Sequence, residues 1–203
     1  MRPLILFAHG AGAGHDHPWM QRWWLRLADL GDIHRLTYPY MARGRRIPDA
    51  MEELEAAHIQ EATALAERHP SQPLILVGKS MGGRVSVRIA DRIGPAAVVV
   101  FGYPLISSGK KKTRRDAPLR AVRTPTLLIQ GTRDPMAPVP EVMDLVADHP
   151  TGSLQVRVVE HGDHSLESLK RPLRARGLNQ GDIDEEICFD IGRFIAAVQR
   201  AVV

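Results

Sequence analysis

The sequence predicts an α/β fold in which a minimal, mainly parallel sheet of six strands is covered by helices on both faces. Short runs of Val, Ile and Leu alternate with longer amphipathic segments, the pattern of parallel strands joined by helices. The runs are rich in Val, Ile and Leu, which is typical of strands buried on both faces. The 203 residues are enough for one domain and tight for two, and no linker or repeat divides them. We therefore expect a single domain over residues 1–203.

The six predicted strands share a high content of aliphatic residues. They are Leu4–Ala8, Ile33–Thr37, Leu74–Val77, Ala97–Phe101, Thr126–Gln130 and Leu154–Val159. Helices are predicted in the intervening segments, where apolar residues recur near helical spacing. They are Trp19–Leu30, Pro48–Arg68, Ser80–Ile93, Pro140–Ala147 and Asp184–Ala201. Pro48 is expected in the first turn of the second helix, a position that proline favours.

Composition argues against several classes of protein. Hydrophobic residues make up 44% of the chain and charged residues 25%, close to the averages for soluble globular proteins. The apolar runs are far shorter than the roughly 20 residues that a membrane-spanning helix needs, and the first residues lack the features of a signal peptide. The only cysteine, Cys188, cannot form an intramolecular disulfide and is expected to be a buried thiol. We expect a cytoplasmic protein with no membrane partner.

The net charge of +4 includes one dense basic block, Lys110–Arg115. No aromatic residues interleave with this block, although stacking on bases requires them. The block is therefore interpreted as a solvated loop, and no nucleic-acid partner is expected.

The most informative stretch is Leu74–Arg84, an apolar strand that runs into Gly-x-Ser-x-Gly and then into a helix. Gly78 and Gly82 stand two residues before and after Ser80, where a tight strand-to-helix turn leaves no room for side chains. The helix N-terminus at this turn favours negative charge. The pattern predicts a nucleophile elbow with Ser80 as nucleophile and the Met81 N–H as one donor of an oxyanion hole.

A second strand leads into the glycine-rich loop His9–Gly14. An oxyanion hole needs a second backbone N–H from the loop after an earlier strand. Ala11 is expected to supply it, and Gly10 is the adjacent alternative.

Two nucleotide-binding interpretations use the same segments and fit them less well. A phosphate-binding loop that ends in Gly78-Lys79-Ser80 needs a glycine five positions before Gly78, where Pro73 stands. A dinucleotide-binding turn after the first strand needs a glycine at the position of His15.

A serine nucleophile also needs a histidine base and an acid that orients it, and in this arrangement both follow the serine at the ends of later strands. Asp134 follows the strand Thr126–Gln130, although Asp-Pro is also a common turn pair. The next strand leads to two histidines, His161 and His164. His164 is expected to be the base because it lies deeper in the loop, whereas His161 directly ends the strand.

Other histidines near the N-terminus raise the question of a metal. His9, His15 and His17, with Asp16, do not have the spacing of a standard metal site, so no metal is expected. His9 is instead expected to brace its loop, with the other two histidines on the pocket rim.

These motifs resemble the α/β-hydrolase superfamily, and within it the small uncapped hydrolases near dienelactone hydrolase. The resemblance rests on His9-Gly10-Ala11-Gly12-Ala13, Gly78-Lys79-Ser80-Met81-Gly82-Gly83-Arg84, Tyr103-Pro104-Leu105, Gly131-Thr132-Arg133-Asp134-Pro135 and Gly162-Asp163-His164. It implies an α/β-hydrolase fold and carries the roles of nucleophile, acid and base onto Ser80, Asp134 and His164. The chain departs from that pattern in lacking the first two strands of a full-length hydrolase sheet. It also has serine where dienelactone hydrolase has cysteine, so that enzyme's substrate is not implied.

The residues and the resemblance together predict a serine hydrolase that cleaves a small-molecule ester through an acyl-enzyme on Ser80, without a cofactor. An acyltransferase with the same triad and a non-catalytic binding or scaffold protein on the same fold are the alternatives. Gly10, Tyr38 and Tyr103 are expected to contact the substrate. Too few residues separate Phe101 from Thr126 for a lid domain, which favours an open site and short acyl chains. A monomer or a homodimer is expected.

Overall fold

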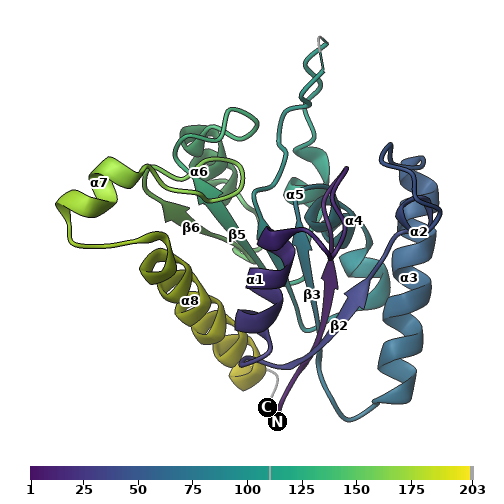
Figure 1. Cartoon of the computed structure of the whole chain (residues 1–203). Coiled ribbons are helices and arrows are strands. Elements are labelled where there is room, and N and C mark those ends of the chain that lie inside the picture. The colour runs from purple at the N-terminus through teal and green to yellow at the C-terminus, as the bar shows by residue number, and fades with distance from the viewer. Residues whose placement is uncertain (110, 202–203) are drawn as a thin grey trace.

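A computed structural model describes residues 1–109 and 111–201, and it contains a six-stranded sheet in which every neighbouring pair runs parallel. The strand order is β2-β1-β3-β4-β5-β6 (Figure 1). The strands are β1 Leu4–Ala8, β2 Asp32–Leu36, β3 Leu74–Lys79, β4 Ala97–Phe101, β5 Thr126–Gly131 and β6 Leu154–Val159. All six predicted strands are confirmed: β1, β4 and β6 have the predicted ends, and the ends of β2, β3 and β5 differ by one or two residues.

Helices cover both faces of this sheet (Figure 1). They are α1 Pro18–Leu27, α2 Pro39–Ala42, α3 Met51–Arg68, α4 Met81–Ile93, α5 Ala117–Ala121, α6 Val139–Ala147, α7 Lys170–Ala175 and α8 Gln180–Ala201. Alternate residues of each strand point to opposite faces. In β1, Leu4 and Leu6 belong to a core with side chains of α3 and α4, whereas Ile5 and Phe7 belong to a second core with side chains of α1 and α8.

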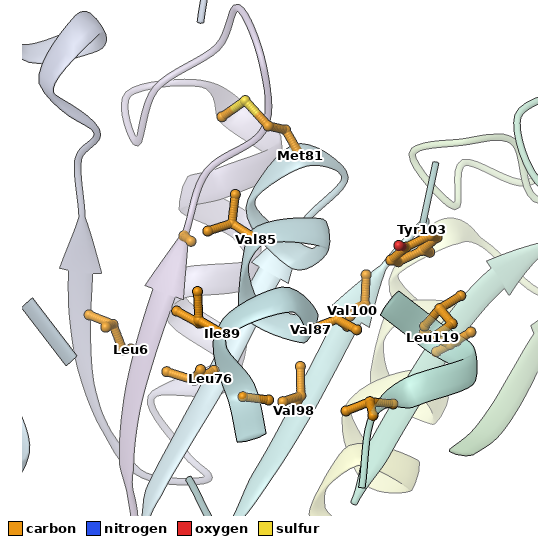
Figure 2. Packing of buried hydrophobic residues seen from close by; sticks show 14 of the residues in the cluster. Leu6, Leu76, Met81, Val85, Val87, Ile89, Val98, Val100, Tyr103 and Leu119 are labelled. Atoms are coloured by element: carbon orange, nitrogen blue, oxygen red, sulfur yellow. The ribbon is translucent and has the colours of Figure 1, made fainter. Parts of the chain in front are cut away.

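Figure 2 shows how α4 packs on the centre of the sheet. Val85 and Ile89 of α4 lie in the same buried cluster as Leu76 of β3 and Val98 of β4, and all four side chains have no exposed surface. Burial of each such side chain contributes about 1.5–3 kcal/mol. The packing fixes α4, and therefore the turn that joins β3 to α4, firmly against the sheet.

Two long helices start elsewhere than the sequence pattern predicts. α3 begins at Met51 rather than Pro48, because the side chain of Asp49 pairs with Arg43 and Arg45 and keeps this segment in the preceding loop. α8 begins at Gln180 rather than Asp184.

Reciprocal bonds explain the early start of α8. The Gly181 N–H donates to Asn179 Oδ1, and the Asn179 N–H donates to Asp182 Oδ2, both at 2.7 Å. Such a pair of bonds is a capping arrangement that stabilises the first turn of a helix.

The connection between β4 and β5 carries no lid domain in its described part. Its one helix there is α5, which has five residues, and Ile106 and Arg114 form an isolated antiparallel bridge. The connection projects beyond the carboxyl ends of the strands (Figure 1). Of the basic block predicted as a solvated loop, Lys110 lies outside the described residues, while Lys111 and Lys112 are exposed.

Two further expectations concern burial and the membrane. Cys188 on α8 is half-buried rather than fully buried, and its thiol contacts the carbonyl oxygen of Arg26 at 3.5 Å. Within the described residues, no helix combines the length and the apolar character that crossing a bilayer requires.

Candidate active site

The loops at the carboxyl ends of the strands bring together the residues predicted to carry chemistry. Ser80 follows β3, Asp134 follows β5 and His164 follows β6, while Gly10 and Ala11 follow β1. In open parallel sheets, ligands bind at this edge. The strand order places β3 next to β1 and β4, so Ser80 lies near the middle of the edge.

Ser80 stands on a sharp turn between β3 and α4 with φ 50° and ψ −109°. A positive φ is uncommon for a residue other than glycine and is a strained conformation. Its N–H donates to the Phe101 carbonyl oxygen at 2.9 Å. A Cβ on Gly78 would lie 2.2 Å from the Gly83 nitrogen, and one on Gly82 would lie 2.6 Å from the His9 oxygen. Glycine at these two positions is therefore what allows the turn to close.

His164 lies between the serine and the aspartate. Its Nε2 is 2.8 Å from Ser80 Oγ, and its Nδ1 is 2.6 Å from Asp134 Oδ2. An ionised carboxylate only accepts hydrogen bonds, so Nδ1 carries the proton and Nε2 is free to accept the proton of the Ser80 hydroxyl. The three side chains form one continuous hydrogen-bonded chain.

Asp134 is 3% exposed and is held by further donors. Gln130 Nε2 donates to its Oδ2 at 2.8 Å, and the Met136 N–H donates to its Oδ1 at 2.9 Å, which is an Asx turn. Burial raises the pKa of Asp134, but the hydrogen bond and charge of His164 and the other two donors together bring it below the usual value. The carboxylate is therefore ionised at neutral pH. Asp134 therefore forms an Asx turn and also contacts His164, so the two interpretations of the Asp-Pro pair are compatible.

His161, the other candidate base, is exposed and has a φ of 59°. Its N–H donates to Thr132 Oγ1 at 2.8 Å, and its carbonyl oxygen accepts a bond from Arg133. Within the described residues, its ring makes none of the contacts that His164 makes.

The loop after β1 is oriented by His9. His9 Nε2 accepts the Tyr38 N–H at 3.2 Å, so Nδ1 carries the proton and donates to the Gly10 oxygen at 2.7 Å. The Tyr40 hydroxyl donates to the same oxygen at 3.4 Å. A trans peptide directs its C=O and its N–H to opposite sides, so the Ala11 N–H is directed away from the buried His9 ring.

A pocket of about 670 Å³ opens above Ser80, and Gly10, Ala11, Met81 and His164 contribute to its wall. The Met81 N–H is at the N-terminus of α4, where backbone donors lack partners within the helix. Apolar side chains of Met20, Met51 and Leu54 form another part of the wall.

The expected contacts of two tyrosines with this pocket are wrong. Tyr38 and Tyr103 have no exposed surface and do not line the pocket. The Tyr38 hydroxyl is 3.0 Å from Nδ1 of the buried His58, and the Tyr103 hydroxyl donates to the Arg115 oxygen at 2.7 Å. Both residues follow a strand, but their rings turn into the core beneath the loops, as Figure 2 shows for Tyr103.

The histidines near the N-terminus, His15 and His17, lie in different environments. His17 lines the pocket, and its Nδ1 accepts the Trp19 N–H at the start of α1. His15 does not line it: its Nε2 lies 2.9 Å from the Leu36 oxygen, and burial lowers its pKa to about 4. In the described residues, no group of three or more His, Cys, Asp or Glu side chains is arranged to hold a metal ion.

Lys79, the residue before the nucleophile, is a pocket residue that the sequence reasoning did not select. Its ammonium group donates to the His164 carbonyl oxygen and lies 5.3 Å from the centre of the Trp19 ring. Burial lowers its pKa to about 8, and the negative charges of Asp134 and Asp163 oppose that shift. The signal that points to it is a lysine inside an otherwise apolar strand end.

A larger cavity, of about 1180 Å³, lies at the other edge of the sheet. Its wall includes Pro73, Ala96, Pro125 and Ser153, which precede β3, β4, β5 and β6. This is the amino edge, and it contains none of the three hydrogen-bonded residues described above. We therefore place the candidate site in the smaller pocket.

Residues 1–196 match the family described as alpha/beta hydrolase domain. The chain therefore belongs to the α/β-hydrolase family, and its class is that of a hydrolase.

Solved structures of this class have a similar fold. A serine hydrolase without lid from Xanthomonas campestris is 15% identical, with a TM-score of 0.65 over 100% of this chain and 83% of that one. An esterase of Pyrococcus furiosus is 15% identical, with a TM-score of 0.70 over 96% of this chain and 82% of that one. An α/β serine hydrolase homologue from Coxiella burnetii is 16% identical, with a TM-score of 0.67 over 80% of this chain and 76% of that one. At these identities the likeness concerns the fold.

Proposed function

We propose that this protein is a serine hydrolase that cleaves a small carboxylic ester through an acyl-enzyme on Ser80. The observation that carries the proposal is the continuous chain from Ser80 Oγ through His164 to Asp134, with separations of 2.8 and 2.6 Å. A serine hydroxyl is a weak nucleophile until an adjacent base takes its proton, and these contacts supply that base and its orienting acid.

The first half-reaction forms the acyl-enzyme. Ser80 Oγ attacks the ester carbonyl carbon while its proton passes to His164 Nε2, and the carbonyl oxygen becomes an oxyanion. The Met81 and Ala11 N–H groups bind this oxyanion. The hydrogen bond from His9 fixes the Gly10 carbonyl and thereby orients the Ala11 N–H for this role. His164 then gives its proton to the alcohol oxygen as the bond to the acyl carbon breaks.

The second half-reaction returns the enzyme to its starting state. Water attacks the acyl carbon, His164 accepts its proton, and Ser80 Oγ leaves with that proton as the acid is released. Asp134 remains ionised throughout and stabilises the positive charge that His164 carries transiently. The cycle uses only residues of this chain and water, so no cofactor is needed.

A serine-directed fluorophosphonate probe tests the proposal. We expect one phosphonate on Ser80, identified by peptide mass spectrometry, and hydrolysis of p-nitrophenyl butyrate that falls by orders of magnitude in Ser80→Ala. Ser165, which also lines the pocket, provides the matched control, because Ser165→Ala should keep both labelling and hydrolysis. Labelling of Ser165 with Ser80 unmodified would contradict the proposal, and so would turnover that survives in Ser80→Ala.

The acceptor of the acyl group is tested separately. Release of free butyrate at the same rate as p-nitrophenol identifies water as the acceptor. A requirement for an added alcohol or amine would identify an acyltransferase instead.

A further inference from the structure

Two arginines, Arg84 and Arg115, line the same pocket as Ser80. Arg84 is on the first turns of α4, and Arg115 is in the connection between β4 and β5. Within residues 1–109 and 111–201, neither guanidinium forms an ion pair or donates a hydrogen bond. By contrast, Arg88, one turn further along α4, forms an ion pair with Glu55. Arg92 forms a second ion pair with the same carboxylate.

The two guanidinium groups influence each other. Both side chains are half-buried. Both residues line the same pocket. Burial lowers the pKa of Arg84, the positive charges of Arg115 and Arg88 lower it further, and the negative charge of Glu55 opposes that shift. Like charges in a partly desolvated wall repel one another, and an anion between them removes that repulsion.

The other charged side chains of the pocket do not neutralise them. Asp49 also lines it, but its two carboxylate oxygens are bonded to Arg43 at 2.8 Å and Arg45 at 3.0 Å. Lys79 adds another positive charge, and its ammonium group is directed to the His164 carbonyl oxygen. The pocket therefore has an excess of positive charge, carried mainly by Arg84 and Arg115.

We propose that this pocket selects esters that carry a carboxylate, and that Arg84 and Arg115 bind that group. The guanidinium fork matches the two oxygens of a carboxylate and can donate two hydrogen bonds to it. The inference rests on the proposed function, since it names the substrate class of the same site. The carboxylate belongs to the acyl part or to the alcohol part of the ester, and the two are distinguished by experiment.

Three esters of similar size provide the test. Mono-p-nitrophenyl succinate has the carboxylate on its acyl part, 4-butyryloxybenzoate has it on its alcohol part, and p-nitrophenyl butyrate is neutral. We expect kcat/KM for one of the acidic esters to exceed that for the neutral ester by about tenfold or more, as charge-assisted hydrogen bonds allow. The favoured ester shows on which side the arginines bind.

Variants assign the preference to the two arginines. In Arg84→Gln/Arg115→Gln we expect the ratio of acidic to neutral kcat/KM to fall by about tenfold or more, mainly through KM, and Arg84→Lys/Arg115→Lys should restore part of it. Arg92→Gln/Arg120→Gln loses the same net charge outside this pocket and should keep the ratio. An unchanged ratio in the Arg84/Arg115 variant, or no preference in the wild-type protein, would overturn the inference.

A binding measurement separates this inference from the proposed function. Monomethyl succinate and methyl butyrate are titrated calorimetrically into Ser80→Ala, which needs no turnover. If none of the esters is hydrolysed, the proposed function fails. The inference of a carboxylate site then stands if monomethyl succinate binds more tightly than methyl butyrate and loses that advantage with Arg84→Gln/Arg115→Gln. Equal binding of the two probes would overturn it.

Discussion

The ammonium group of Lys79 donates a hydrogen bond to the main-chain oxygen of His164. Lys79 immediately precedes Ser80, so this bond connects the end of β3 to the loop that carries the histidine. The lysine is 9% exposed, and burial lowers its pKa to about 8. The contact holds the His164 loop in place at a cost to the stability of the fold.

Replacement of this lysine should raise the stability of the fold and lower the activity. Lys79→Met removes the desolvated charge, so we expect the free energy of unfolding at pH 7 to rise by about 1 kcal/mol after the lost hydrogen bond is counted. The released His164 loop should lower kcat by about tenfold. Thermal unfolding and p-nitrophenyl butyrate kinetics measure the two effects, and a variant that is less stable and fully active would contradict this account.

Gly102, just after β4, should also be intolerant of a side chain, because it lies against the His164 loop. Its φ is +65°, and a Cβ there would lie 2.5 Å from the His164 oxygen and 3.2 Å from His164 Nδ1. Gly102→Ala should therefore displace the histidine and lower kcat by at least about tenfold.

Gly94 offers a matched control. Its φ is +69°, and a Cβ there would meet nothing within 4 Å. Gly94→Ala should incur only the left-handed backbone strain, about 1–2 kcal/mol of stability, and leave kcat unchanged. Equal kinetic effects of the two alanine variants would show that the strain, rather than the contact with His164, is responsible.

Acid should destabilise the fold through His58. Burial lowers its pKa to about 3 from 6.5, so below pH 6.5 the unfolded chain binds a proton that the folded chain does not. The free energy of unfolding should therefore fall as the pH falls, by about 3 kcal/mol for this residue between pH 6.5 and 4. His15, with a pKa of about 4, adds to the effect.

His58→Gln tests this assignment, because glutamine does not titrate and can still accept the Tyr38 hydroxyl. Urea unfolding at several pH values should give a flatter pH dependence than the wild-type protein. The same slope in both proteins would assign the acid sensitivity to other groups.

Substrate length should matter only over a few carbons. Each methylene buried against Met20, Met51 or Leu54 contributes about 0.8 kcal/mol, or roughly fourfold in kcat/KM. In its described part, however, the connection between β4 and β5 supplies no lid domain that would extend this wall. We expect kcat/KM for p-nitrophenyl esters to level off at short acyl chains, without interfacial activation. A steady rise to long acyl chains would contradict this expectation.

The fold was predictable from sequence because the central strands contain continuous apolar runs, such as Leu4–Ala8 and Ala97–Phe101, and these runs place two cores on opposite faces. The short helices α2, α5 and α7 were not predicted, because segments of four to six residues are too short to show a helical period. Helix starts depend on side-chain contacts such as that of Asp49, which periodicity does not report.

The candidate site was predictable where local geometry constrains residue type. Gly78 and Gly82 flank Ser80 because a side chain at either position would clash with main-chain atoms. Arg84 and Arg115 were not found, because an arginine on a helix or loop is usually solvated and only the fold shows which ones face a pocket. Tyr38 and Tyr103 were misplaced because a residue after a strand can turn to either side.

The central claim is that Ser80 carries the acyl group between the two half-reactions. Intact-protein mass spectrometry of a rapidly acid-quenched reaction with p-nitrophenyl butyrate measures this directly. We expect a species heavier by one butyryl group, with the added mass on the peptide that contains Ser80 and absent in Ser80→Ala. Hydrolysis without any acylated protein, or an acyl group found on another residue, would contradict the account.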